Sequence, residues 1–137
     1  MGIENVINDR DLILTEAAIV ESLRRSANVD LHPKLVHALL IYDKQGRAVL
    51  AELYQSYIHI AHKADVPILI GAPTWRANSE RLADSCVTED VNDDAVSFLN
   101  NLRSSYEDWA GNIFVGGCCG TGSEHLEYIV QNIQREE

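Results

Sequence analysis

The sequence predicts an α/β fold in which helices cover a parallel sheet. Short apolar runs of strand length alternate with longer segments whose apolar residues recur every three or four positions. This alternation is typical of parallel strands joined by helical crossovers. No internal repeat, low-complexity tract or linker interrupts the 137 residues. We therefore expect one domain that spans residues 1–137.

Three apolar runs have the length and composition of strands. The first covers residues 12–14 and follows a charged segment. The second covers residues 67–72 and contains a continuous Ile-Leu-Ile run, as expected for a strand buried on both faces. The third covers residues 112–115. The segments between these runs are long enough to contain the helices that parallel connections require.

Helical periodicity is present between the first and second runs. A short helix is expected over residues 17–25 and a long helix over roughly 47–63, while residues 36–40 fit either a helical turn or a buried strand. The residues expected on the buried side of the long helix are Leu50, Leu53, Tyr54, Tyr57, Ile58 and Ala61.

Two further helices are expected toward the C-terminus. Thr88 is a plausible N-cap for a helix that runs to about Trp109, where Gly111 ends it. Its inner side would carry Val91, Ala95, Phe98, Leu102 and Tyr106. Thr121 and Glu124 have the spacing of a capping box, which predicts a last helix beginning near Gly122.

Charge and composition exclude several classes of partner. The formal net charge is −10, from 21 acidic and 11 basic residues, so neither nucleic acid nor an anionic membrane is an expected partner. No apolar run reaches the roughly 18 residues of a membrane span. Residues 1–10 are polar and unlike a signal peptide, and three cysteines form no disulfide framework. A reducing, cytoplasmic location is expected.

The most informative segment is the Gly-Gly-Cys-Cys-Gly-Thr run at residues 116–121, between the third strand and the last helix. Neighbouring side chains of a regular strand point to opposite faces, so Cys118 and Cys119 share a metal only where the backbone has left the strand. The flanking glycines permit such a backbone. The segment resembles the zinc-binding GGCCGT signature of the homocysteine S-methyltransferase family, whose members are (β/α)8 barrels that methylate a thiol.

The resemblance extends over other parts of the chain. The Pro-Thr-Trp-Arg-Ala-Asn run at residues 73–78 looks like the segment after the family's second strand. Residues 11–106 are similar to the family's first third, and residues 112–137 to its last strand and helix. The middle of the barrel is missing, and a complete barrel needs about 200 residues. The resemblance thus implies a partial (β/α) barrel.

The resemblance also implies the order of the strands. The first, second and third runs correspond to the family's first, second and last strands. In the closed barrel the first strand lies between the last and the second, so the expected order is 3-1-2. Both outer strands would then lack partners, and unpaired strand edges favour association. We therefore expect a homodimer or a larger homo-oligomer.

In the family, three thiolates hold zinc and the substrate thiol takes the fourth position. Coordination deprotonates the thiol, which then attacks a methyl group on a sulfonium or similar donor. Cys118 and Cys119 match two of the ligands, and no residue matches the third. Alternatively, the two cysteines are small packing residues inherited from a barrel, or ligands of a structural zinc shared by two associated chains.

Four residues are candidate substrate contacts, one from the resemblance and three from their place after the second strand. Glu21 corresponds to the glutamate that touches the substrate amine, while Trp75, Arg76 and Asn78 follow the second strand at the edge where ligands bind in parallel folds. Arg76 suits a substrate carboxylate and Trp75 a pocket wall. The competing interpretation is an exposed helix carboxylate, a core tryptophan and an arginine that ties down its own loop.

Two other classes of protein remain open. Gly120, Thr121, Gly122 and Ser123 lie at an expected helix start, where free backbone N–H groups suit a phosphate without any metal. A non-catalytic barrel remnant that assembles with itself is the other class.

Overall fold

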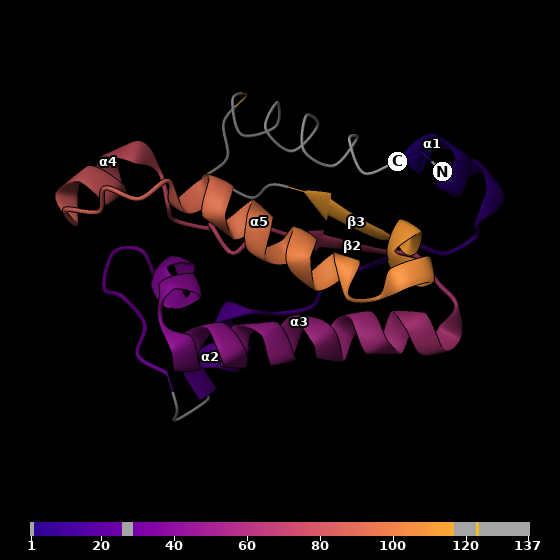
Figure 1. The fold of residues 1–137 in the computed structure, drawn as a ribbon, viewed down its shortest axis with the longest axis horizontal. Coiled ribbons are helices and arrows are strands. Elements are labelled where there is room, and N and C mark those ends of the chain that lie inside the picture. The colour runs from indigo at the N-terminus through magenta and orange to yellow at the C-terminus, as the bar shows by residue number, and fades with distance from the viewer. Residues whose placement is uncertain (1, 26–28, 117–122, 124–137) are drawn as a thin grey trace.

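The computed structural model describes residues 2–25, 29–116 and 123 (Figure 1). Strands β1 (Leu14–Thr15), β2 (Ile68–Gly71) and β3 (Ile113–Gly116) form a parallel three-stranded sheet. All three expected strands are confirmed within two residues, as is the mixed α/β class. The described strands form an open sheet with β1 and β3 at its edges.

The expected strand order, 3-1-2, is wrong, because β2 and not β1 is central. Ile68 is aligned with Leu14 on one side and with Ile113 on the other. A central strand has neighbours on both edges, which suits the longest of the three apolar runs expected to be strands. The two-residue β1 follows the charged residues Asp9, Arg10 and Asp11, and short edge strands of this kind limit unwanted pairing.

Helices and 3₁₀ turns connect the strands. The α-helices are α1 (Ile3–Asp9), α2 (Val20–Arg25), α3 (Lys44–Ala64), α4 (Ser79–Asp84) and α5 (Val91–Ser104), and the 3₁₀ helices are η1 (Ala38–Tyr42) and η2 (Glu107–Asn112). The sequence analysis missed α1 and α4, which have seven and six residues and bury little. Of the ambiguous segment 36–40, residues 38–40 lie in η1, His37 is its N-cap, and Val36 forms an isolated bridge with His32.

The long helix α3 agrees with its expected stripe. Leu50, Tyr54, Ile58 and Ala61 are fully buried, and Leu53 and Tyr57 pack partly buried against the same core. The helix begins three residues earlier than expected because Asp43 caps it, its carboxylate accepting a hydrogen bond from the Gly46 N–H at 2.6 Å. Asp65 ends the helix in the left-handed region, with φ 54°.

The helix expected from Thr88 to Trp109 is shorter than predicted. Asp90 is its N-cap, and α5 ends at Ser104, well before Gly111. The hydroxyl groups of Ser104 and Ser105 donate hydrogen bonds to the carbonyls of Asn100 and Leu102, a competition with backbone pairing that disfavours helix. The chain then turns into η2, and Gly111 lies inside that 3₁₀ helix.

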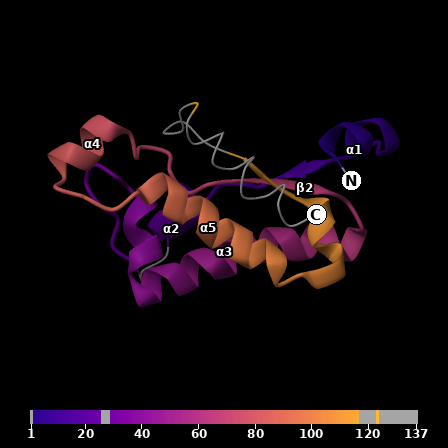
Figure 2. The same cartoon turned by 45° about the horizontal axis from the view of Figure 1, so that its top comes forward.

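The described elements form two layers, in which α3 and α5 cover one face of the sheet (Figures 1 and 2). Ile68 and Ile70 of β2 point into this core and are 1% and 0% exposed, whereas Leu69 between them is 36% exposed. The expectation that β2 is buried on both faces is therefore wrong for Leu69. The core includes Leu50, Tyr54, Ile58, Phe98, Leu99 and Ile113.

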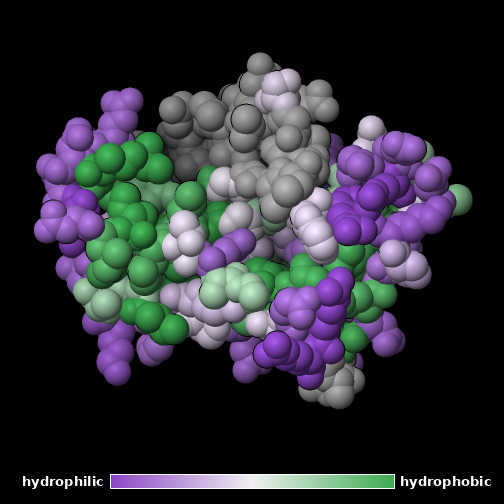
Figure 3. Space-filling model, turned by 180° about the vertical axis from the view of Figure 1, so that it is seen from behind, coloured by the Kyte–Doolittle hydropathy of each residue, from purple (hydrophilic) through white to green (hydrophobic). Residues whose placement is uncertain are grey.

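The surface is uneven in hydropathy. Seen from behind, apolar side chains gather toward the end of the molecule that carries α1 (Figure 3). Ile3, Ile7 and Leu12 belong to the exposed apolar side chains at the start of the chain. Among the helices that the structure describes, none has both the length and the apolar character to cross a membrane.

Tyr54 ties α3 to the carboxyl end of β2, because its hydroxyl donates a hydrogen bond to the Gly71 carbonyl at 2.6 Å. We predict that Tyr54→Phe lowers the free energy of unfolding by about 1–2 kcal/mol, since a half-buried carbonyl loses its donor. Urea denaturation measures this loss. Tyr57→Phe is the control: it removes a hydroxyl that donates to the exposed Ala18 carbonyl at 2.7 Å and should cost less than half as much. Equal losses in the two variants would contradict this explanation.

Candidate functional site

A pocket of about 330 Å³ opens where β1 and β2 end. Its wall is mainly apolar and is formed by Ala17, Ala18, Ile19, Val20, Tyr54, Ala72 and Trp75, with Glu16, Glu21, Arg24 and His37 as its polar members. Glu16 directly follows β1 and Ala72 directly follows β2. The pocket therefore lies at the edge of the sheet where parallel α/β folds bind ligands.

Glu16 is the acidic group held most firmly at this edge. Its Oε2 accepts a hydrogen bond from the Gly71 N–H at 2.9 Å. Burial raises the pKa of Glu16 to about 7, while the hydrogen bond from Gly71 opposes that rise. Near neutral pH the carboxyl group is therefore divided between its acid and its carboxylate form, and it can donate or accept a proton.

His37 is the most deeply buried polar member of the pocket wall. It stands at the N-cap of η1 and is 3% exposed. Burial lowers the pKa of His37 to about 4, so the imidazole is neutral at pH 7. Among the residues that the structure describes, its Nδ1 has no hydrogen-bond partner.

Two tyrosines of α3 hold the backbone around the pocket. Tyr54 bonds the Gly71 carbonyl, and Tyr57 bonds the Ala18 carbonyl. The segment from Glu16 to Ile19 is thus attached both to β2 and to α3, so the pocket wall rests on the helical core.

The substrate contacts expected from the sequence are distributed over three places. Glu21 and Trp75 line the pocket, although Glu21 is exposed and forms an ion pair with Arg24 at 2.7 Å. The guanidinium of Arg76 lies over the Trp75 ring, 4.5 Å from its centroid. Asn78 caps α4, its side-chain oxygen accepting a hydrogen bond from the Arg81 N–H at 2.9 Å. The structure therefore brings Glu21 and Trp75 together at the pocket, whereas Arg76 stacks on Trp75 and Asn78 lies at the start of α4.

The expected zinc ligands Cys118 and Cys119 lie outside the described residues, as do Gly120, Thr121 and Gly122 of the anion-binding alternative. Ser123 is described and is helical and exposed. Within the described ranges, no three His, Cys, Asp or Glu side chains come together in a group that would hold a metal ion. The third cysteine, Cys86, is exposed next to the end of α4.

β3 ends beside the pocket, because the Gly116 carbonyl accepts a hydrogen bond from the Ala72 N–H at 2.9 Å.

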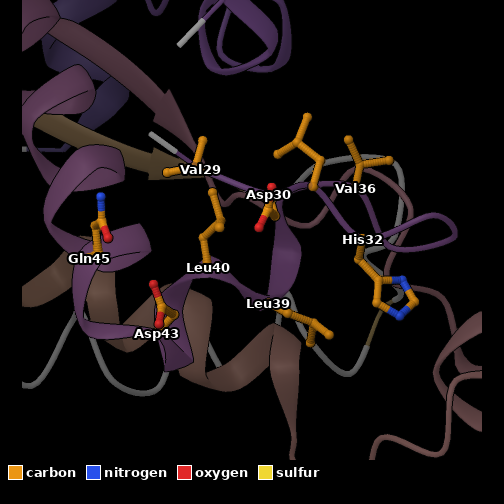
Figure 4. Close-up of a pocket in the computed structure, with 9 residues that line it drawn as sticks. Val29, Asp30, His32, Val36, Leu39, Leu40, Asp43 and Gln45 are labelled. Carbon is orange, nitrogen blue, oxygen red and sulfur yellow. The ribbon is translucent and has the colours of Figure 1, made fainter. Parts of the chain in front are cut away.

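A larger pocket, of about 520 Å³, lies between residues 29–36 and the start of α3 (Figure 4). Asp43 and Gln45 lie on one side of it, and His32 and Val36 lie on the other (Figure 4). His32 Nδ1 accepts hydrogen bonds from the backbone N–H groups of Lys34 and Leu35, and Asp43 caps α3. Because these polar groups stabilise local backbone, we take the smaller pocket as the candidate site.

The sequence analysis named neither His37 nor Glu16 as a site residue and assigned the substrate amine to Glu21. The position of Glu16, directly after the first strand, was a usable signal, since ligand groups of parallel folds follow strand ends. The signal for His37 was a lone polar residue within the apolar run from Leu35 to Ile41. Its burial depends on contacts with distant residues, which the run by itself does not reveal.

No family model, curated protein or solved structure matches this chain.

Glu16→Gln tests the raised pKa of the pocket carboxyl. The folded protein binds this proton more tightly than the unfolded chain, so stability falls as pH rises from the ordinary pKa of 4.5 to about 7. The amide keeps an acceptor for the Gly71 N–H without any charge. We predict that the variant melts at a higher temperature than the parent at pH 8, and that the difference disappears near pH 4.

The matched control is Glu21→Gln, which alters an exposed carboxylate paired with Arg24. It should gain no stability at pH 8, because exposed ion pairs contribute little and no burial is relieved. A Glu16→Gln variant whose stability tracks that of the parent at every pH would show that the Glu16 carboxyl is not buried as described.

Proposed function

We propose that this protein binds a small thiol of the homocysteine type in the pocket at the ends of β1 and β2, and that it transfers a methyl group to the sulfur. The observation that carries the proposal is the apolar pocket with the Glu16 carboxyl in its wall, beside the Gly116 end of β3. The Gly-Gly-Cys-Cys-Gly-Thr motif begins at that same residue.

The described residues support binding of an amino-acid thiol. Glu16 is suited to the substrate amine, because an ammonium group beside it would favour the ionised carboxylate. This assignment replaces Glu21, whose carboxylate is paired with Arg24. Trp75 and the aliphatic wall would exclude water from the methylene chain of the substrate.

Zinc is part of the proposal through Cys118 and Cys119, whose soft thiolates are suitable ligands. When bound, zinc would supply the charge that keeps the substrate thiol deprotonated at neutral pH. Two cysteines fall short of the three ligands that catalytic zinc sites use, so a third ligand from this chain or from a second copy belongs to the proposal. Free thiolates require reducing conditions, which a cytoplasmic location would provide.

A second candidate function is that of a non-catalytic, self-assembling scaffold. It is supported by the open sheet, in which β1 and β3 each have only β2 as a described neighbour. Unpaired strand edges favour association, so we propose a homo-oligomer in either case.

Metal analysis separates these functions. In protein purified under reducing conditions, we expect zinc near one per chain, and loss of that zinc in Cys118→Ser/Cys119→Ser. Cys86→Ser is the control and should keep the metal, because Cys86 is a free exposed thiol. Methyl transfer from a methylsulfonium donor to L-homocysteine should follow the zinc content.

The outcomes point in different directions. Zinc at one per two chains would indicate a structural site shared across a dimer. A stable oligomer with neither zinc nor methyl transfer would contradict the enzyme and favour the scaffold.

A further inference from the structure

A buried imidazole in the pocket wall lacks a hydrogen-bond partner. His37 is 3% exposed, and its Nδ1 bonds to nothing in the part of the chain that the structure describes. Buried polar groups in proteins are nearly always paired, so an unpaired one requires an explanation. Leaving such a nitrogen without a partner costs free energy that an apolar side chain would avoid.

Within the described residues, no side-chain hydrogen bond gives this histidine a structural role. It stands at the N-cap of η1, but its side chain makes no capping hydrogen bond. Its chain neighbours Leu35 and Ala38 are fully buried in apolar surroundings. An apolar residue at position 37 would therefore suit the local packing better than an imidazole.

We propose that His37 is a ligand-contacting residue, whose imidazole forms a hydrogen bond with a polar group of a small, mainly aliphatic molecule in the pocket. The pocket wall supports this assignment, because it combines an aliphatic and aromatic lining with His37 on η1 and Glu16 after β1. A bound molecule would thereby meet two hydrogen-bonding groups from two separate elements. This inference deepens the proposed function, since it rests on the same pocket.

The chemistry of the two groups defines the class of ligand. A volume of about 330 Å³ suits a short chain that ends in polar groups. Burial keeps His37 neutral, so it recognises its partner by a hydrogen bond and not by an ion pair. An amide, hydroxyl or carboxyl group on a short aliphatic chain meets this requirement, and the thiol is not needed for the contact.

The test compares three histidine variants with two probes, L-homocysteine and butyramide. Butyramide has a short aliphatic chain and an amide group but neither thiol nor charge. Trp109→Phe leaves Trp75 as the single tryptophan, and its fluorescence reports binding in the pocket. His37→Leu removes the hydrogen-bonding nitrogen, His37→Asn keeps a polar atom near the position of Nδ1, and His59→Leu alters an exposed histidine of α3 as the control.

We expect His37→Leu to weaken the binding of both probes by about tenfold, as the loss of one hydrogen bond would. The same variant should melt at a higher temperature than the parent, because it no longer buries an unpaired nitrogen. His37→Asn should restore most of the affinity, and His59→Leu should leave it unchanged. A purely structural histidine would not produce weaker binding together with higher stability.

Nuclear magnetic resonance of the unmutated imidazole keeps the test decisive if His37→Leu fails to fold. A long-range ¹H–¹⁵N spectrum should show the Nδ1 resonance of His37 moving as butyramide is added. A probe that changes Trp75 fluorescence but neither moves this resonance nor loses affinity in His37→Leu would overturn the inference. Binding of butyramide without L-homocysteine would sink the proposed substrate and leave His37 as a ligand contact, whereas binding of neither probe would overturn both.

Discussion

β2 is paired in parallel with a neighbour on each side, and the positions of the other elements follow from that arrangement. Its residues Ile68 and Ile70 are buried in one core with side chains of α3 and α5, and Ile68 is aligned with Leu14 of β1 and Ile113 of β3. The three strands therefore end at one edge of the sheet. Tyr54 fixes that edge to the core through the Gly71 carbonyl. The candidate pocket is a consequence of this geometry, since Glu16 and Ala72 are the residues that directly follow β1 and β2.

One physical cause gives the pocket its chemical character. Burial disfavours charge, so it raises the pKa of Glu16 and lowers the pKa of His37. The two groups thus move toward neutrality from opposite directions. An apolar wall with weakly charged hydrogen-bonding groups is suited to an amphipathic molecule, whose aliphatic part gains from burial while its polar ends find partners. The same desolvation lowers the stability of the folded protein and leaves Glu16 and His37 able to form hydrogen bonds with a ligand.

Local patterns predicted the elements better than their arrangement. The stripe on α3 and the positions of β2 and β3 were legible because periodicity and apolar runs report burial directly. The strand order was wrong because it depends on pairing between distant segments, and the resemblance to a barrel placed the first strand at the centre. The end of α5 was wrong because the Ser104 and Ser105 hydroxyls compete for backbone carbonyls, an effect that apolar periodicity does not include. At the site, Trp75 was found by its place after β2, whereas the burial of His37 arises from contacts that only the folded chain brings together.

The hydrogen bond between Glu16 and Gly71 has a consequence for the sheet itself. β1 pairs with β2 through the N–H groups of Leu14 and Glu16, which bond the carbonyls of Pro67 and Leu69. The N–H of Gly71 lies two residues beyond Leu69, and it is the Glu16 side chain, through Oε2, that accepts its hydrogen bond. A carboxyl group thus extends a two-residue strand by one further bond. The rate at which the Gly71 amide hydrogen exchanges with solvent should therefore depend on the ionisation of Glu16. The same rate would change when a molecule bound in the pocket alters that carboxyl group or the end of the sheet.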